Sequence, residues 1–208
     1  MLEHVPKWIG ALLHNVRAGH AKLAIVQPEI GTGHAVITVT SPAFANGARL
    51  PERFTADGEG VSPPLLWSKI PDGTRSLVLI VEDPDAPAMQ PLVHALVWSL
   101  PASATSLREG EIRADTASPE DGRDVGRNSY FTEGWLPPDP PTGHGPHDYV
   151  FQLFALDETP DIPENPGRSA VLKAMAGRVI GAGMLVGTYS RGEEQPVTGG
   201  QMARSPTS

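Results

Sequence analysis

Apolar residues in this chain form short runs between turn-forming residues, a pattern typical of a fold made mostly of β-strands. Branched and aromatic residues dominate these runs, which favours buried strands. The pattern predicts strands over residues 35–40, 65–67, 77–82, 92–100, 149–156 and 184–189. One helix is predicted in the same body, over residues 169–179, where apolar residues recur at helical spacing and Ser169 can cap the first turn.

The first 24 residues follow a different pattern, with apolar residues at roughly helical spacing and mainly basic residues among the charged ones. They predict a short amphipathic helix that packs on its own domain or on a partner subunit. Residues 1–34 are therefore expected to form this helix and a linker, residues 35–191 a β domain, and residues 192–208 a mobile tail.

The composition excludes several classes of function. The chain has 208 residues with 22 glycines and 22 prolines, which suits one β-rich domain with many turns. Its net charge of −8 disfavours nucleic acid as a partner, because phosphate backbones require a basic face. The absence of cysteine excludes disulfides and thiolate chemistry. No apolar run approaches the roughly 20 residues of a membrane span, so stable membrane insertion is not expected and a cytoplasmic location is predicted.

An acidic corner fixed by prolines, residues 83–87, follows the strand predicted over residues 77–82. Pro84 and Pro87 restrict the backbone, so the corner can aim the carboxylates of Asp83 and Asp85 with little loss of entropy. The same residue types are also common in turns that merely end a strand. The corner is therefore a candidate site that needs support from other segments.

Histidines at the edges of apolar strands supply that support. His94 lies in the apolar run directly after the corner, and His147 precedes the run at residues 149–156. Asp83 and His94 can meet at one end of the sheet, and His147 can join them there. Polar groups at the edge of an apolar core are costly unless they are paired or functional. His144, in a loop rich in glycine and proline, is expected to be solvated.

Together these segments resemble the phosphatidylethanolamine-binding protein family, and most of all its bacterial Raf-kinase-inhibitor-like (YbhB/YbcL-like) branch. The resemblance covers residues 35–191. It rests on Asp83-Pro84-Asp85-Ala86-Pro87, on His94 in its apolar strand, on the double proline before Gly145-x-His147-x-Tyr149, and on Leu185-Val186-Gly187-Thr188-Tyr189.

The resemblance implies an antiparallel Greek-key fold of two β-sheets, with one or two peripheral helices and an anion-binding cavity at one end. It implies that Asp83, His94 and His147 line the cavity and that Asp85, Pro141 and Tyr149 lie near it. Eukaryotic relatives bind phosphorylated head groups and regulate kinases and other partners. A small anionic ligand and a regulatory role are therefore expected, with a protein kinase or a protease as candidate partner and a homodimer as candidate assembly.

Two departures from the family pattern bear on the ligand. Asp148 stands where the family usually has arginine after the second histidine. If this carboxylate pointed inward, it would repel a phosphate. The loop before His94 is also short, with Met89-Gln90-Pro91 in place of an insert, and Leu92 stands where eukaryotic relatives have tryptophan.

Three classes of function stay open. The first, which is favoured, is a binding or regulatory module whose histidines, kept protonated by the carboxylate, hold an anion, so that binding weakens as the pH rises. The second is a metal-dependent hydrolase, because the Asp and His side chains carry metal-binding atoms. The third is an inhibitor of a kinase or protease that acts by surface contacts. The α/β-hydrolase elbow and the metalloprotease, P-loop and dinucleotide motifs are all absent, so no catalytic residue, metal or cofactor is assigned.

Overall fold

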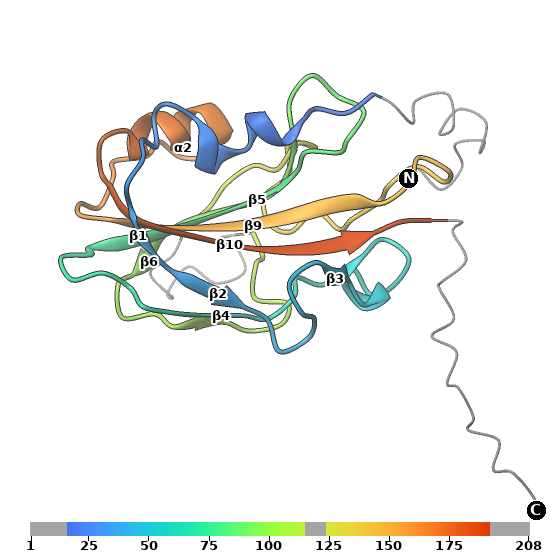
Figure 1. Ribbon diagram of the computed structural model, residues 1–208, viewed down its shortest axis with the longest axis horizontal. Helices are drawn as coiled ribbons and strands as arrows, with labels where there is room; N and C mark the ends of the chain where they lie inside the picture. The colour runs from blue at the N-terminus through green and yellow to red at the C-terminus, as the bar shows by residue number, and fades with distance from the viewer. Residues whose placement is uncertain (1–15, 115–123, 192–208) are drawn as a thin grey trace, which may run out of the picture.

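A large β-sheet forms the middle layer of the protein in the computed structural model, which describes residues 16–114 and 124–191. A small sheet covers one of its faces, and helix α2 (Arg168–Met175) covers the other together with the N-terminal segment (Figure 1). The mostly β, two-sheet fold predicted from the sequence is confirmed.

The large sheet has seven strands in the order β1-β10-β9-β5-β6-β8, with β3 paired to β10 outside this path. Its strands are β1 (Ala35–Val36), β3 (Ala48–Arg49), β5 (Ser76–Asp83), β6 (Leu92–Pro101), β8 (Asp124–Val125), β9 (His147–Leu156) and β10 (Val179–Tyr189). The small sheet has the order β2-β4-β7, with β2 (Thr38–Thr40), β4 (Leu65–Ser68) and β7 (Ser106–Leu107). The pairing is antiparallel except that β1 and β3 run parallel to β10, which departs from the fully antiparallel prediction. A short 3-10 turn, η4 (Glu52–Phe54), follows β3.

Both faces of the large sheet are buried, which explains why its central strands read as unbroken apolar runs. Successive side chains of a strand point to opposite faces, so Leu79 and Val81 of β5 pack toward the small sheet, whereas Val78 and Ile80 pack toward α2. All residues of β5 are buried as a result. The two cores therefore share the large sheet as their common wall.

Residues 16–30, called the N-terminal strap below, lie across the large sheet beside α2 (Figure 1). The strap contains two 3-10 turns, η2 (His20–Lys22) and η3 (Ala24–Val26), where the end of the amphipathic helix predicted over residues 1–24 and the start of the linker were expected. Side chains of the sheet satisfy its amides instead: Ala24 N donates to Glu82 Oε2 at 2.7 Å and Ile25 N to Gln152 Oε1 at 2.8 Å. The amides of these two residues therefore need no α-helical hydrogen bonds. The rest of the predicted helix, residues 1–15, lies outside the described residues.

The segment predicted as one strand over residues 35–40 forms two strands in different sheets. Ile37 lies between β1 and β2, where it is buried and donates its N–H to Ala182 O at 2.9 Å. Gly183 allows this crossing, because a Cβ on it would lie 2.2 Å from the carbonyl oxygen of Ile37. A run of branched residues predicts extended backbone but does not show where the chain changes sheet.

Helix α2 and strand β10 also differ from their predicted bounds. The helix ends at Met175, not at residue 179, because Gly177 has a positive φ of 72° and Val179 already begins β10. Strand β10 therefore starts earlier than the predicted residue 184. Ser169 is not the cap, since Gly167 holds that position without any side-chain hydrogen bond.

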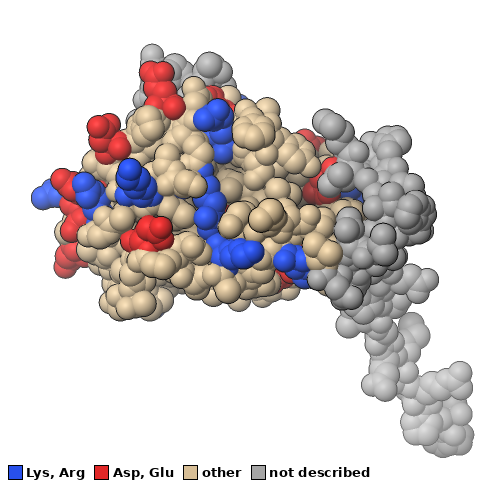
Figure 2. Space-filling view, turned by 90° about the horizontal axis from the view of Figure 1, so that it is seen from above, with Lys and Arg blue, Asp and Glu red and all other residues tan. Residues whose placement is uncertain are grey.

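Figure 2 views the molecule from the side of the strap and α2, and lysine and arginine side chains form a row across the middle of this face. The excess of acidic residues in the chain is therefore not concentrated there. No helix within the described ranges is both long enough and apolar enough to span a bilayer. The mobile tail predicted over residues 192–208 lies outside the part of the chain that the structure describes.

Candidate functional site

A pocket lies where the acidic corner, the start of β6 and the loop before β9 meet. Its cavity volume is only about 30 Å³, far below the roughly 300–1,000 Å³ common for small-molecule sites, so it has room for a small polar group. Its lining residues are Asp83, Ala86, Pro87, Leu92, His94, Tyr130, Leu136, Pro137, Asp139, Pro140, Pro141, His147 and Tyr149. Five of the six predicted site residues are in this lining, and Asp85 lies behind it.

Strand alternation decides which polar side chains reach the pocket. On β9, His147 and Tyr149 line the pocket, while Asp148 points to the other face. On β5, Asp83 faces the pocket, while Glu82 faces the strap and α2. The neighbouring carboxylates of Glu82 and Asp83 therefore lie on opposite faces of the large sheet, and only that of Asp83 reaches the pocket.

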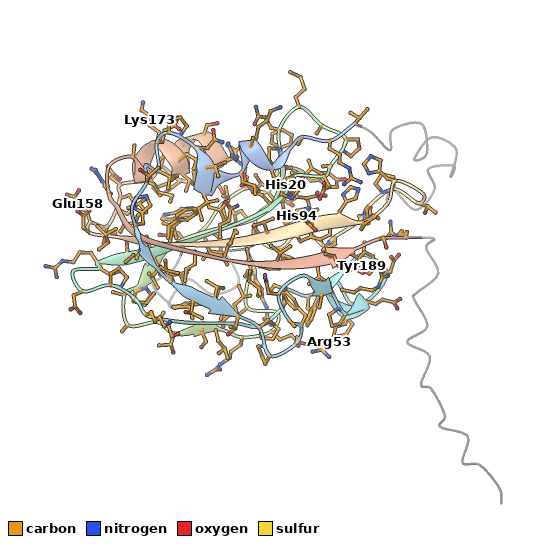
Figure 3. The ribbon with its side chains drawn as sticks, viewed as in Figure 1. His20, Arg53, His94, Glu158, Lys173 and Tyr189 are labelled. Carbon is orange, nitrogen blue, oxygen red and sulfur yellow. The ribbon has the colours of Figure 1, made fainter. Side chains whose placement is uncertain are left out.

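Asp148, the main departure from the family pattern, does not add its charge to the pocket wall. Its Oδ2 lies 3.1 Å from Nε2 of His20 in the strap. Figure 3 labels His20 on the side of the strap and His94 close to β9. The condition under which Asp148 would repel a phosphate, an inward-facing side chain, is therefore not met.

A chain of hydrogen bonds forms the buried wall of the pocket. His147 donates its Nδ1–H to Asp83 Oδ2 at 2.7 Å, since a carboxylate can only accept. The Nε2 of His147 lies 2.6 Å from Nδ1 of His144. Both ring nitrogens of His147 are thus used inside the protein, and the other oxygen of Asp83 accepts the backbone N–H of Asp85 at 2.8 Å.

His144 is a site residue that the sequence reasoning missed. It was expected in solvent, but it is fully buried and contacts His147. Gly143 and Gly145 turn the loop inward, with φ values of 83° and 91° that favour glycine. Two glycines around a histidine, three residues before a second histidine, are the signal that could have identified it.

Two polar atoms of the pocket have no protein partner. His94 donates its Nδ1–H to the carbonyl oxygen of Leu136 at 2.7 Å. Its Nε2 and the hydroxyl of Tyr149 are buried without a hydrogen bond, and the two rings meet edge to face with centroids 5.0 Å apart. A buried polar atom without a partner is unfavourable, so these two atoms mark where a ligand or an ordered water would bind.

Burial sets the charge of these two groups. It lowers the pKa of His94, and the opposing attraction of Asp83 is the smaller effect. The ring is therefore neutral near pH 7, with a lone pair on Nε2. Burial likewise raises the pKa of Tyr149 well above its usual value, so the phenol keeps its proton. This corrects the expectation that the carboxylate holds both pocket histidines protonated, because desolvation dominates at His94.

Arg191 holds the proline wall of the pocket in place. Its guanidinium donates to Asp57 Oδ1 at 2.6 Å, to the carboxylate of Asp139 and to the carbonyl of Pro140 at 3.3 Å. The hydrogen bond from Arg191 lowers the pKa of Asp57 and keeps it ionised. Asp139, Pro140 and the predicted residue Pro141 line the pocket together, so this wall is anchored to the end of β10.

Comparisons with known proteins identify the family. The family model described as phosphatidylethanolamine-binding protein matches residues 40–190. The chain belongs to the phosphatidylethanolamine-binding protein family. Its relatives in this family include a UPF0098 protein of Methanothermobacter thermautotrophicus, 40% identical over 72% of this chain and 96% of the relative. Another is a UPF0098 protein of Aquifex aeolicus, 36% identical over 76% of this chain and 91% of the relative.

Solved structures of the phosphatidylethanolamine-binding protein family agree with this assignment. YbcL of E. coli, described as a member of the mammalian family, is 30% identical with a TM-score of 0.69 and covers 74% of this chain and 98% of its own. The putative family homologue CT736 from Chlamydia trachomatis is 34% identical with a TM-score of 0.67, over 76% of this chain and 99% of its own. The family and bacterial branch predicted from the motifs are confirmed.

The availability of metal-binding atoms in the pocket tests the alternative that the protein is a metal-dependent hydrolase. His147 has no free ring nitrogen, and both oxygens of Asp83 accept hydrogen bonds. Across the described ranges, the cluster of metal-type donors comprises His20, Asp85 and Asp148, outside the pocket lining. These donors do not favour a metal-activated water inside the pocket.

A strained aromatic residue, Phe131, directly follows Tyr130 of the pocket lining in the chain. Phe131 is 81% exposed and has a φ of 61°, while its neighbour Tyr130 lines the pocket. Asn128 fixes the turn, since its Oδ1 accepts the N–H of Tyr130 and its Nδ2 donates to Thr132 Oγ1, each at 2.9 Å. Positive φ is unfavourable for a bulky side chain.

Replacing Phe131 with asparagine is expected to raise the free energy of unfolding by about 1 kcal/mol, because asparagine tolerates positive φ and little burial is lost. Urea unfolding would measure the change. Met89→Asn is the matched control, since Met89 is also an exposed apolar residue, at 86%, but is not among the positive-φ residues. Equal or lower stability of Phe131→Asn relative to wild type would refute the strain argument.

Proposed function

We propose that this family member is a binding protein whose pocket takes a small oxyanion together with one proton, such as a phosphate monoester or a carboxylate. The observation that carries the proposal is the pair of buried, unpartnered atoms, His94 Nε2 and the Tyr149 hydroxyl. A neutral imidazole nitrogen accepts a hydrogen bond from a protonated oxygen. The hydroxyl of Tyr149 can donate to an ionised oxygen of the same ligand.

The charge of the lining supports the proton-carrying form of the ligand. The carboxylates of Asp83 and Asp139 line the pocket, and no lysine or arginine among the described residues does so. Both carboxylates are already bonded, to His147 and Arg191 respectively. A dianion would still be repelled, whereas a protonated ligand brings less charge and supplies the donor that His94 lacks.

Binding of phenyl phosphate is expected to strengthen about tenfold for each unit that the pH falls from 8 to 7, because one proton is taken up on binding. Above pH ~6 the free ester is mostly a dianion, and burial lowers the pKa of His94 so that the free ring carries no extra proton. The complex therefore holds one proton more than its separated parts. Isothermal titration across this pH range measures the slope, and pH-independent affinity contradicts the proposal.

Substitutions separate the two binding atoms in the same assay. His94→Ala is expected to weaken binding at least tenfold at pH 7 and to flatten the pH slope, because the acceptor for the ligand proton is gone. Tyr149→Phe removes only the hydroxyl, so it should weaken binding by up to about tenfold and keep the slope. Wild-type affinity in His94→Ala would show that the ligand binds elsewhere.

Phe131 favours a second candidate function, a surface for a protein partner such as a kinase or a protease. An exposed aromatic side chain held in a strained turn is the kind of outlier that suggests a role in recognition. The same turn carries Tyr130 into the pocket lining, so an occupied pocket could alter this surface, which is the form of regulation we propose. Inhibition assays on kinases and proteases, with wild type against Phe131→Asn, test it; equal effects of the two proteins would remove this candidate.

A further inference from the structure

Arg17 in the N-terminal strap contacts both loops that carry the polar wall of the pocket. Its Nη1 lies 2.5 Å from Asp85 Oδ1 in the acidic corner. The same Nη1 donates to the carbonyl of Pro146 at 3.1 Å, and Nη2 donates to the carbonyl of His144 at 3.4 Å. One guanidinium therefore joins two segments that lie far apart in the sequence.

Asp85 links Arg17 to the pocket wall. Its carboxylate is mostly buried, and its Oδ2 accepts the N–H of Asp148, at the start of β9, at 2.8 Å. Its own N–H donates to Asp83 Oδ1 at 2.8 Å. Arg17, Asp85 and Asp83 thus form a continuous series of contacts that ends at His147.

The backbone of the strap follows the same acidic corner. Ala18 N donates to Ala86 O at 3.0 Å, and Gly19 N donates to Pro84 O at 2.8 Å. Gly19 has a φ of 101°, a conformation that favours glycine and lets the strap stay close to the corner. The strap therefore presents Arg17 to Asp85 from a fixed backbone.

We propose that Arg17 is a positioning residue of the pocket, so that this one side chain of the N-terminal strap belongs to the binding site. Arg17 holds Asp85, and through Asp85 it fixes the hydrogen-bonded wall of Asp83, His147 and His144. The strap comprises residues 16–30, whereas the family model matches residues 40–190. The domain shared by the family is therefore not the complete site in this chain.

The guanidinium suits this role for two reasons. Its planar fork places two nitrogens on three acceptors at once, which a lysine ammonium on a single atom cannot reproduce. Its charge also offsets Asp85, which otherwise adds a buried negative charge next to Asp83. Without Arg17, the wall is less ordered and more negative, and both changes weaken the binding of an anion.

The test compares Arg17→Ala, Arg17→Lys and Lys22→Ala, and it follows two signals. The first is the proton NMR signal of the His147 Nδ1–H, which its buried bond to Asp83 protects from exchange and which needs no ligand. The second is the affinity for phenyl phosphate at pH 7, a readout that rests on the function proposed above. Lys22→Ala is the matched control, because Lys22 also ties the strap to the corner loop, through Met89 O at 2.8 Å, without touching Asp85.

Arg17→Ala is expected to shift or broaden the His147 signal and to weaken phenyl phosphate binding about tenfold. Arg17→Lys should recover part of the His147 signal and part of the affinity. Lys22→Ala should change neither the signal nor the affinity. An unchanged His147 signal in a folded Arg17→Ala protein overturns the proposal. If Arg17→Ala does not fold, Arg17→Gln, which keeps donors without the charge, is measured in its place.

The two proposals fail in different ways. If the wild type does not bind phenyl phosphate, the function proposed above is wrong, and the His147 signal still decides the role of Arg17. If the wild type binds, but Arg17→Ala binds equally well with an unchanged His147 signal, only the role of Arg17 is rejected.

Discussion

Replacing Glu82 with alanine is expected to lower the free energy of unfolding by about 3–5 kcal/mol, the usual effect of breaking a buried ion pair. Glu82 is fully buried on β5. Its Oε2 accepts Ala24 N at 2.7 Å and Gln152 Nε2 at 2.8 Å, and its Oε1 bonds Arg168 of α2. Alanine leaves these donors without a partner and detaches the strap and α2 from the sheet at the same point.

Urea unfolding followed by tryptophan fluorescence measures this loss. The matched control is Glu158→Ala, because Glu158 pairs with Arg178 at 3.2 Å but is 66% exposed. Its loss should change the free energy of unfolding by less than about 1 kcal/mol. Since Glu82 points away from the pocket, folded Glu82→Ala should keep the His147 signal. A loss below about 1 kcal/mol for Glu82→Ala would mean that water replaces the missing carboxylate.

Replacing the adjacent Asp83 with alanine is expected to affect both stability and binding. Two donors, His147 Nδ1 and Asp85 N, lose their acceptor in a buried site. At about 1–3 kcal/mol for each unsatisfied group, the free energy of unfolding should fall by roughly 3 kcal/mol. The imidazole of His147 also loses the bond that fixes its orientation, so phenyl phosphate should bind at least tenfold more weakly.

Asp83→Asn, measured in the same phenyl phosphate assay, distinguishes the positioning role of Asp83 from the effect of its negative charge. Asparagine keeps the shape and one acceptor but cannot accept from both donors, so its losses should be smaller than those of alanine. The removal of a negative charge alone would instead strengthen the binding of an anion. Tighter binding by Asp83→Asn than by wild type would therefore show that repulsion, not positioning, is the main effect of Asp83.

The sequence predicted much of the pocket because its residues lie at the ends of strongly apolar strands. Asp83, His94 and His147 each flank or begin such a strand, and the structure places all three in one lining. Asp85 belongs to the same motif but lies behind the wall. His144 was misjudged, because only the inward turn of its glycine-flanked loop buries it.

The sequence by itself determined the central strands and the family, since apolar runs and proline-fixed corners depend on neighbouring residues. The tertiary structure alone decided the protonation of His94, because desolvation depends on every atom around the ring and not on its neighbours in the chain. It also decided the partners of Asp85 and Glu82. Arg17 and Ala24 reach these carboxylates across more than fifty residues of sequence, and contacts at that separation form only when the strap packs on the sheet.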